Sequence, residues 1–357
     1  MSERSIIAAR LVNQGIAAPV AGTPARAVAR LGAMQAQDGA AVRWAIGLRC
    51  QEVTPASIEQ ALATGDVVRT WLLRGTLHVV AAADVRWMLD LLAPRILAAG
   101  AGRRRQLDLD DVTLERSLDI MAGALEGGAV LARRELLQVL ERAGIATTGQ
   151  RGYHLLGHAG LCGLICFGPR HGKQESFVLL DTRAPAAPAL DRAAALGMLA
   201  LRYFTGHGPA TLADFTWWSG LPLGEARQAL AVARTELEQY SINDTPYFHG
   251  DAAAAPAGDA AAAVYLLPAF DEYYLGYAQR ELVLATGLDK RVVSSNGIFR
   301  PAIVVDGQIV GIWRSVRKGS SVRVQPELFD GLDSAGERAL HQAMERYAAF
   351  LGASVVL

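Results

Sequence analysis

Residues 116–181 carry the pattern that most restricts the fold of this chain. Apolar residues recur at helical spacing over 133–143, and a second helix is predicted over 150–164 after a short turn with glycine. Two apolar segments within 165–180 flank a turn with glycine and proline, which is typical of a β-hairpin. Helix, turn, helix and hairpin in this order are the elements of a winged helix. The sequence therefore predicts a winged-helix unit over 116–189.

Residues 190–250 repeat this plan. A first helix precedes Thr211, which with Asp214 three residues later is typical of a capping box at the start of the next helix. A third helix is expected over 223–239, followed by short strands. This segment is therefore predicted to be another winged helix.

The N-terminal residues 1–115 fit the same plan less clearly. Residues 67–73 and 76–80 are predicted to be paired strands joined tightly at Arg74-Gly75, and a long helix is expected over 83–97. We expect a third winged helix here.

Residues 251–357 differ from the three preceding segments. The stretch 251–263 is of low complexity and carries no chemistry. Asp306-Gly307 lies between two β-branched runs, which is a strong signal for a hairpin. The expected fold class is therefore α+β and predominantly helical, with three tandem winged helices followed by a small α+β region with β-hairpins.

The composition limits the kind of protein. The chain has 357 residues, of which 51% are hydrophobic and 20% charged, as in a folded protein of several domains. No run of about 18 apolar residues occurs and the first residues lack a signal-peptide layout, so a cytoplasmic location without membrane association is expected. The cysteines, Cys50, Cys162 and Cys166, cannot form a disulfide framework or a zinc cluster. We expect neither a metal nor another cofactor.

The charges alone do not identify a partner. The net charge is zero, which argues against a surface coated with one sign of charge. Lysine occurs only at positions 173, 290 and 318, so the basic residues are almost all arginine. Arginine suits phosphate and base recognition, but a GC-rich genome produces the same bias. Arginine clusters, each of which also reads as a solvated face, lie at 103–105, 133–134, 170–173 and 314–323.

Two primary amides, Gln35 and Gln37, lie two residues apart after a helix expected to begin at Thr23-Pro24. If they are extended, alternation points both amides to one face and turns Ala36 inward. If they are helical, the two side chains diverge by about 200°. Only the extended alternative gives a pair that can hold one water or one sugar, and the sequence leaves both alternatives open.

Four motifs are specific when taken together: Met34-Gln35-Ala36-Gln37-Asp38, RTWLLRGTLH at 69–78, LPAFDEYYLGY at 267–277 and NGIFRP at 296–301. In these motifs, and over nearly its whole length, the chain resembles the winged-helix DNA glycosylases of the AlkZ type. The resemblance implies three winged helices around a concave, DNA-sized surface. It also implies a catalytic signature of glutamine, an apolar residue and glutamine, whose places are filled by Gln35, Ala36 and Gln37.

The implied activity is monofunctional excision of N7-alkylated purines, with bulky natural-product adducts and interstrand crosslinks as candidate lesions, in DNA repair and toxin self-resistance. Alkylation at N7 makes guanine cationic and its glycosidic bond labile, so an amide pair, which is no general base, suffices. Neutral glycosidic bonds normally require two carboxylates. No lysine lies within residues 30–80, so a Schiff-base lyase step is not expected. Asp38 would face away from the amides and is expected to be structural.

The implied partner is double-stranded DNA, bound by a nucleoid-associated monomer. A second class stays open, because tandem winged helices alone would favour a non-catalytic DNA-binding protein or transcriptional regulator. Candidate DNA contacts are the basic residues of the motifs and of the predicted second unit and hairpins: Arg43, Arg69, Arg74, His78, Arg151, His154, Arg170, Lys173, Arg300 and Arg314.

The way a lesion reaches the glutamines follows from its size. A bulky adduct or crosslink stays attached to the duplex and cannot swing fully into a tight pocket. We therefore expect an open cleft, with both amides facing a solvent-filled site from the groove side. No aromatic cage is indicated near the glutamines, and four tryptophans are expected to pack in the core or between segments: Trp44, Trp71, Trp217 and Trp218.

Overall fold

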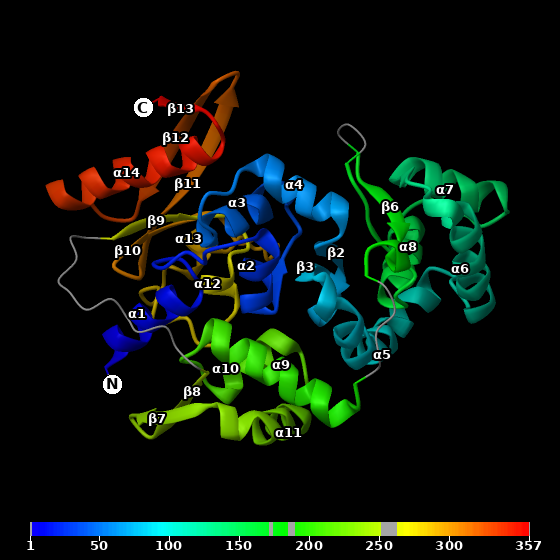
Figure 1. Cartoon of the computed structure of the whole chain (residues 1–357), viewed down its shortest axis with the longest axis horizontal. Coiled ribbons are helices and arrows are strands. Elements are labelled where there is room, and N and C mark those ends of the chain that lie inside the picture. Colours follow the sequence, from blue (N-terminus) through cyan, green and yellow to red (C-terminus); the bar gives the residue numbers. More distant parts are fainter. Residues whose placement is uncertain (1, 171–173, 185–189, 251–262, 357) are drawn as a thin grey trace. The chain divides into compact units, whose positions relative to one another are not determined.

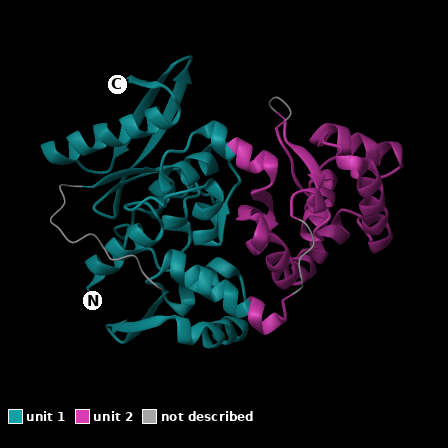
Figure 2. Ribbon diagram, in the orientation of Figure 1, with its two compact units in different colours: residues 1–58, 196–357 teal, residues 59–195 magenta. Residues whose placement is uncertain are grey.

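Helices and short strands alternate along the chain, and the α+β, predominantly helical class expected from the sequence is confirmed (Figure 1). The chain forms two compact units (Figure 2). Unit 1 combines residues 1–58 with 196–357, and unit 2 comprises residues 59–195. The computed structural model describes residues 2–170, 174–184, 190–250 and 263–356.

The N-terminal part of unit 1 is a run of short helices around one strand. Its elements are α1 (Glu3–Asn13), α2 (Pro24–Leu31), β1 (Ala33–Gln35), α3 (Gly39–Arg49) and the start of α4 (Pro55–Thr64). Thr23 caps α2 as expected, because its hydroxyl accepts the backbone N–H of Arg26. Gly32 ends α2 with a φ of 74°, a conformation that favours glycine, and the chain then enters β1.

Residues 190–250 form the expected helices and strands, with one difference. The elements are α9 (Arg192–His207), α10 (Leu212–Ser219), α11 (Leu223–Ala233), β7 (Glu238–Ile242) and β8 (Thr245–His249). The capping box of Thr211 and Asp214 is confirmed. The third helix ends at Ala233 instead of 239, because β7 pairs with β8 across Asn243-Asp244, whose φ values of 48° and 60° suit a tight hairpin turn.

The C-terminal part of unit 1 is a five-stranded sheet with one long helix. In sheet order the strands are β13 (Ser354–Val356), β12 (Ser321–Leu328), β11 (Gln308–Lys318), β10 (Ala302–Val305) and β9 (Val264–Leu267), and the helices are α12 (Glu272–Leu275), α13 (Asp289–Val292) and α14 (Ser334–Phe350). The expected hairpin turn joins β10 to β11, with φ values of 49° at Asp306 and 83° at Gly307. Helix α14 runs alongside the sheet (Figure 1). The low-complexity stretch at 251–262 lies outside the described residues.

Unit 2 contains the helix-turn-helix and hairpin expected from the sequence. Its elements are β2 (Val67–Leu72), β3 (Thr76–Ala81), α5 (Ala82–Gln106), α6 (Asp111–Leu125), β4 (Leu131–Ala132), α7 (Arg133–Arg142), α8 (Arg151–Leu161), β5 (Ile165–Phe167) and β6 (Ser176–Leu179). Strands β2 and β3 pair antiparallel across Arg74 and Gly75, both of positive φ. Helix α5 continues beyond its expected end at residue 97, because alanine and arginine, both good helix formers, dominate 98–105.

Three of the four tryptophans are buried as expected. Trp44 is 6% exposed, Trp71 4% and Trp218 0%. Trp217 is 45% exposed and packs between segments instead, because its indole N–H donates to the carbonyl of Leu275 at 3.0 Å and the guanidinium of Arg280 lies 5.1 Å from its ring centroid. Because successive side chains of a helix point about 100° apart, Trp218 enters the core from α10 while Trp217 turns outward.

The described residues place limits on other chemistry. All three cysteines are free, and burial raises the pKa of each thiol, that of Cys166 to about 12. In this part of the chain no three potential metal ligands come together. A search of the same residues finds no helix that combines the length and the apolar character needed to cross a bilayer.

Trp44→Ala should destabilise the protein strongly. Its indole N–H donates to the carbonyl of Leu266 at 2.7 Å, and its ring centroid lies 5.1 Å from those of Tyr347 and Phe350. Truncating a buried tryptophan costs about 3–5 kcal/mol of unfolding free energy, which urea unfolding measures. The control is Trp217→Ala, and equal losses in both variants would contradict the core assignment of Trp44.

Candidate active site

The two glutamines lie where strand β1 gives way to helix α3. Gln35 is the last residue of β1, Ala36 is fully buried and Gln37 lies in an exposed bend. Asp38 caps α3, and its carboxylate accepts two backbone N–H groups of the first helical turn at 2.7 and 3.0 Å. The structural role expected for Asp38 is therefore confirmed.

The extended alternative holds for Gln35, where the strand ends. Only 9% of Gln35 is exposed, whereas Gln37 lies on the surface. The two amides are therefore unequally exposed, and that of Gln35 is the more covered by the protein. The cause is the bend at Gln37 and Asp38, which starts α3 and interrupts the alternation of the strand.

The amide side chains of this pair are not used inside the protein. Among the described residues, the side-chain amide groups of Gln35 and Gln37 have no hydrogen-bond partner, whereas the backbone N–H of Gln35 is bonded to Glu272. A polar side chain as little exposed as that of Gln35 is nearly always hydrogen-bonded in folded proteins. Each amide has one carbonyl oxygen that accepts and one NH₂ group that donates. Both groups are thus available to a water molecule or to a ligand.

A buried glutamate holds the backbone of Gln35. Oε1 of Glu272 accepts the backbone N–H of Gln35 at 2.9 Å. Oε2 of Glu272 accepts the indole N–H of Trp218 at 3.1 Å and lies 3.3 Å from Nε2 of His207. None of these four residues is more than 9% exposed. The role of Glu272 was not predicted from the sequence, although a glutamate inside an apolar motif is a usable signal, because charged residues are seldom buried without partners.

The neighbouring carboxylate anchors the other end of α3. Asp271 binds the guanidinium of Arg49 through both of its oxygens, at 2.8 and 2.7 Å. Arg49 also donates to the side-chain oxygen of Gln14 at 3.0 Å, and the NH₂ group of Gln14 donates to the hydroxyl of Tyr277 at 2.9 Å. Burial raises the pKa of Tyr277, so its hydroxyl stays protonated. Two adjacent carboxylates of the motif at 267–277 therefore hold the start and the end of the segment from Gln35 to Arg49.

Three of the candidate DNA contacts are engaged inside unit 2 instead. Arg69 pairs with Glu175 at 2.8 Å, and its guanidinium lies 4.2 Å from the ring centroid of Phe167. His78 is fully buried, with Nδ1 3.0 Å from the backbone carbonyl two residues before it. The guanidinium of Arg151 donates to three backbone carbonyls. These contacts argue against direct DNA contacts by these side chains, which satisfy internal polar groups.

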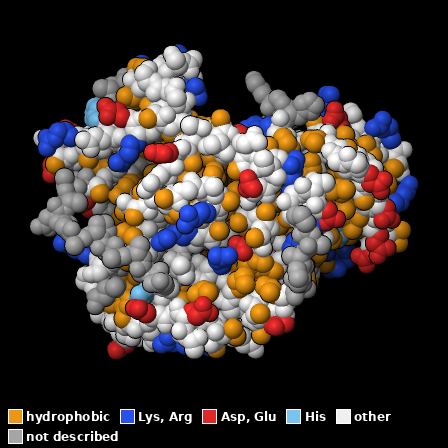
Figure 3. Space-filling view, in the orientation of Figure 1, with side chains coloured by type: hydrophobic (Ala, Val, Ile, Leu, Met, Phe, Trp, Pro, Cys, Tyr) orange, Lys and Arg blue, Asp and Glu red, His pale blue; other side chains and the backbone are white. Residues whose placement is uncertain are grey.

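The other described candidates lie at or near the surface. On the face drawn in Figure 3, basic and acidic side chains are interspersed. Burial, followed by the positive charges of Arg103 and Arg104, lowers the pKa of His154, so its imidazole is neutral at pH 7. Lys173 lies outside the described residues. The exposed candidates are Arg170, Arg300 and Arg314, and the half-buried ones are Arg43, Arg74 and His154.

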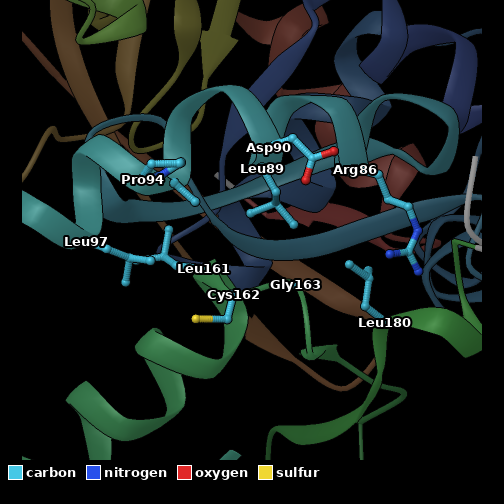
Figure 4. Close-up of a pocket in the computed structure, with 10 residues that line it drawn as sticks. Arg86, Leu89, Asp90, Pro94, Leu97, Leu161, Cys162, Gly163 and Leu180 are labelled. Carbon is cyan, nitrogen blue, oxygen red and sulfur yellow. The ribbon is translucent and has the colours of Figure 1, made fainter. Parts of the chain in front are cut away.

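Unit 2 contains a cavity of about 450 Å³ between α5 and the end of α8 (Figure 4). Its charged lining residues are Arg86 and Asp90, and the guanidinium of Arg86 is already bound to Asp181 and to the carbonyl of Ala184. Leucine side chains and Cys162 form most of the rest. No candidate catalytic residue or DNA contact lines this cavity.

Comparison with known proteins identifies the kind of enzyme. The sequence profile of the family described as DNA glycosylase AlkZ-like matches residues 28–350, a range that includes the glutamine pair and Glu272. The chain belongs to the AlkZ-like DNA glycosylase family. An AlkZ-like chain is an enzyme that hydrolyses N-glycosyl bonds in DNA, so the alternative of a non-catalytic regulator finds no support here.

Two relatives extend this AlkZ-like assignment along the chain. A curated protein of Streptomyces sahachiroi, named interstrand DNA cross-link repair glycosylase, is 27% identical over 372 residues, which cover 98% of this chain and 95% of the relative. The solved structure of Streptomyces sahachiroi DNA glycosylase AlkZ matches with a TM-score of 0.81 and 23% identity, covering 100% of this chain and 99% of that one. The second comparison shows that the fold is shared.

Proposed function

We propose that this enzyme is a monofunctional DNA glycosylase that hydrolyses the N-glycosidic bond of N7-alkylated purines in double-stranded DNA. The observation that carries this proposal is the pair of Gln35 and Gln37, whose amide groups no described residue binds. We include bulky adducts and interstrand crosslinks among the lesions, and the curated relative, an interstrand DNA cross-link repair glycosylase, supports the crosslinks. The cellular roles would be repair of alkylated DNA and resistance to an alkylating toxin.

The proposed chemistry is within the capacity of two amides. A water molecule adds to C1′ of the sugar, the bond from C1′ to the purine breaks, and its electron pair neutralises the positive charge of the alkylated base. The amide oxygens orient the water and stabilise the oxocarbenium-like sugar, and the water loses its proton to solvent. Because the leaving group is already cationic, no general acid is required.

The exposure of Gln37 supports an open route for the lesion. A crosslinked base stays tied to the other strand and cannot enter a sealed pocket. We infer that Gln37 approaches the sugar from the groove side and that the more buried Gln35 forms the rigid half of the pair.

We also propose that the fold comprises three tandem winged helices around a concave surface that binds one duplex as a monomer, in the cytoplasm and at the nucleoid. The element order in unit 2 and in residues 190–250 supports this division. The proposed segments are 1–115 with the catalytic motif, 116–189, 190–250, and the C-terminal α+β region 251–357.

Gln35→Ala and Gln37→Ala should each lower the single-turnover rate of 7-methylguanine excision by about 10²- to 10³-fold, since each removes a positioned polar group from the transition state. Duplex affinity and melting temperature should stay close to those of the wild type. Gln51→Ala, at an exposed glutamine of the same unit, is the control. Full activity of both variants on a lesion that the wild type excises would refute the assignment.

The product should be a free base and an intact abasic strand, because no lysine nucleophile lies near the motif in the sequence. Borohydride reduction during turnover should therefore trap no covalent protein–DNA species on a denaturing gel. A trapped species would show that the enzyme forms a Schiff base and has lyase activity.

Duplex binding should depend on cationic contacts to phosphate. The logarithm of affinity should fall linearly with the logarithm of salt concentration, and Arg170→Glu should make this slope shallower by about one unit. Fluorescence anisotropy measures the slope, with Arg338→Glu on α14 as the control at an exposed arginine outside the candidate contacts. An affinity that does not change with salt concentration, or a preference for one undamaged sequence, would contradict binding through phosphate contacts.

A further inference from the structure

We propose that Glu272 is a positioning residue for Gln35, whose backbone it fixes at the end of β1 so that the amide is aimed at the sugar. The inference rests on the proposed catalytic role of Gln35. The residue that would position Gln35 lies 237 positions away from it in the sequence. Glu272 is 1% exposed and acts through Gln35 without touching the DNA.

The carboxylate of Glu272 is held at both oxygens. Oε1 accepts the Gln35 backbone N–H at 2.9 Å, while Oε2 accepts the indole N–H of Trp218 at 3.1 Å. The carboxylate of Glu272 therefore cannot rotate without breaking its hydrogen bond to the indole N–H of Trp218. It accepts the backbone N–H of Gln35 from a fixed position.

His207 restricts the carboxylate further. Its Nε2 lies 3.3 Å from Oε2 of Glu272, and its Nδ1 has no partner among the described residues. The tautomer with hydrogen on Nε2 donates to Glu272 and leaves no N–H group unpaired. The ring of His207 is stacked on Tyr203 with centroids 4.7 Å apart, and its backbone carbonyl accepts the hydroxyl of Tyr277 at 2.7 Å.

The position of the Gln35 amide depends on this backbone anchor. The amide has no hydrogen-bond partner of its own among the described residues, so backbone and packing alone set its direction. Misplacing a reacting group by about 1 Å costs about 10²-fold in rate. A carboxylate that fixes the strand end thus contributes to the rate without taking part in the reaction.

Glu272→Gln keeps the shape of the side chain and replaces one acceptor oxygen with an NH₂ donor. The new NH₂ group then faces either the backbone N–H of Gln35 or the indole N–H of Trp218, and neither of these donors can accept a hydrogen bond from it. We expect the single-turnover excision rate for 7-methylguanine to fall by about 10- to 100-fold, with unchanged duplex affinity. If this variant does not fold, Glu272→Asp makes the same test, because its shorter carboxylate keeps the charge and withdraws from Gln35.

Trp313→Phe is the control. Trp313 is buried in the same unit, and its indole N–H donates to the carbonyl of Leu267 at 2.8 Å. This variant loses a buried hydrogen bond and should lower the melting temperature, yet the folded protein should excise at the wild-type rate. An equal loss of rate in both variants would mean that Glu272 acts through general stability, which would overturn the proposal.

A second substitution should partly rescue Glu272→Gln. Adding Trp218→Phe removes the indole N–H that opposes the new NH₂ group, and His207 can accept from that group in its other tautomer. The double variant should therefore excise faster than Glu272→Gln although the loss of a buried ring makes it less stable. A double variant that is slower than Glu272→Gln would contradict the proposal.

The backbone amide of Gln35 gives a readout that needs no activity. In a ¹⁵N–¹H spectrum its proton should shift upfield in Glu272→Gln and stay in place in Trp313→Phe. An unmoved resonance, or a wild-type rate in Glu272→Gln while Gln35→Ala is inactive, would overturn the positioning role alone. Wild-type rates in Gln35→Ala and Gln37→Ala would instead refute the proposed function, whatever the spectrum shows.

Discussion

Arg49 and Asp271 form an ion pair that is almost completely shielded from water, and the organisation of unit 1 follows from it. Removing one partner would leave an uncompensated buried charge, which costs about 3–5 kcal/mol. Arg49 is the last residue of α3, and Asp271 is followed directly by Glu272, which binds Gln35 before the same helix. The candidate catalytic segment is thus clamped at its two ends by consecutive residues of one short motif.

Local signals predicted helix starts and hairpin turns better than helix ends. Thr23 and Asp306-Gly307 act through their own backbone, so a hydroxyl before a proline or a turn dipeptide between β-branched runs is sufficient. The end of α11 at Ala233 was not predicted, since it depends on the pairing of β7 with β8. Nor was Glu272, because its partner Gln35 is close only in the folded chain.

The residues of the candidate site were easier to predict from the sequence than their surroundings. Gln35 and Gln37 came from spacing and from family resemblance, but their unequal exposure arises from a bend that Asp38 fixes by capping α3. The surroundings of the candidate arginines were equally hard to predict. A sequence does not reveal whether a guanidinium reaches outward or, as with Arg151, turns back to internal carbonyls. Such choices depend on which acceptors the fold leaves unsatisfied.

The state of the thiols has a consequence for the survival of the enzyme itself. A protein proposed to work on alkylated DNA meets the electrophiles that made the lesions, and thiolates are among the nucleophiles they attack first. Burial raises the pKa of Cys50, Cys162 and Cys166, so each is protonated at neutral pH. With only three lysines, and arginines that stay protonated, the chain also offers an alkylating agent few side-chain amines.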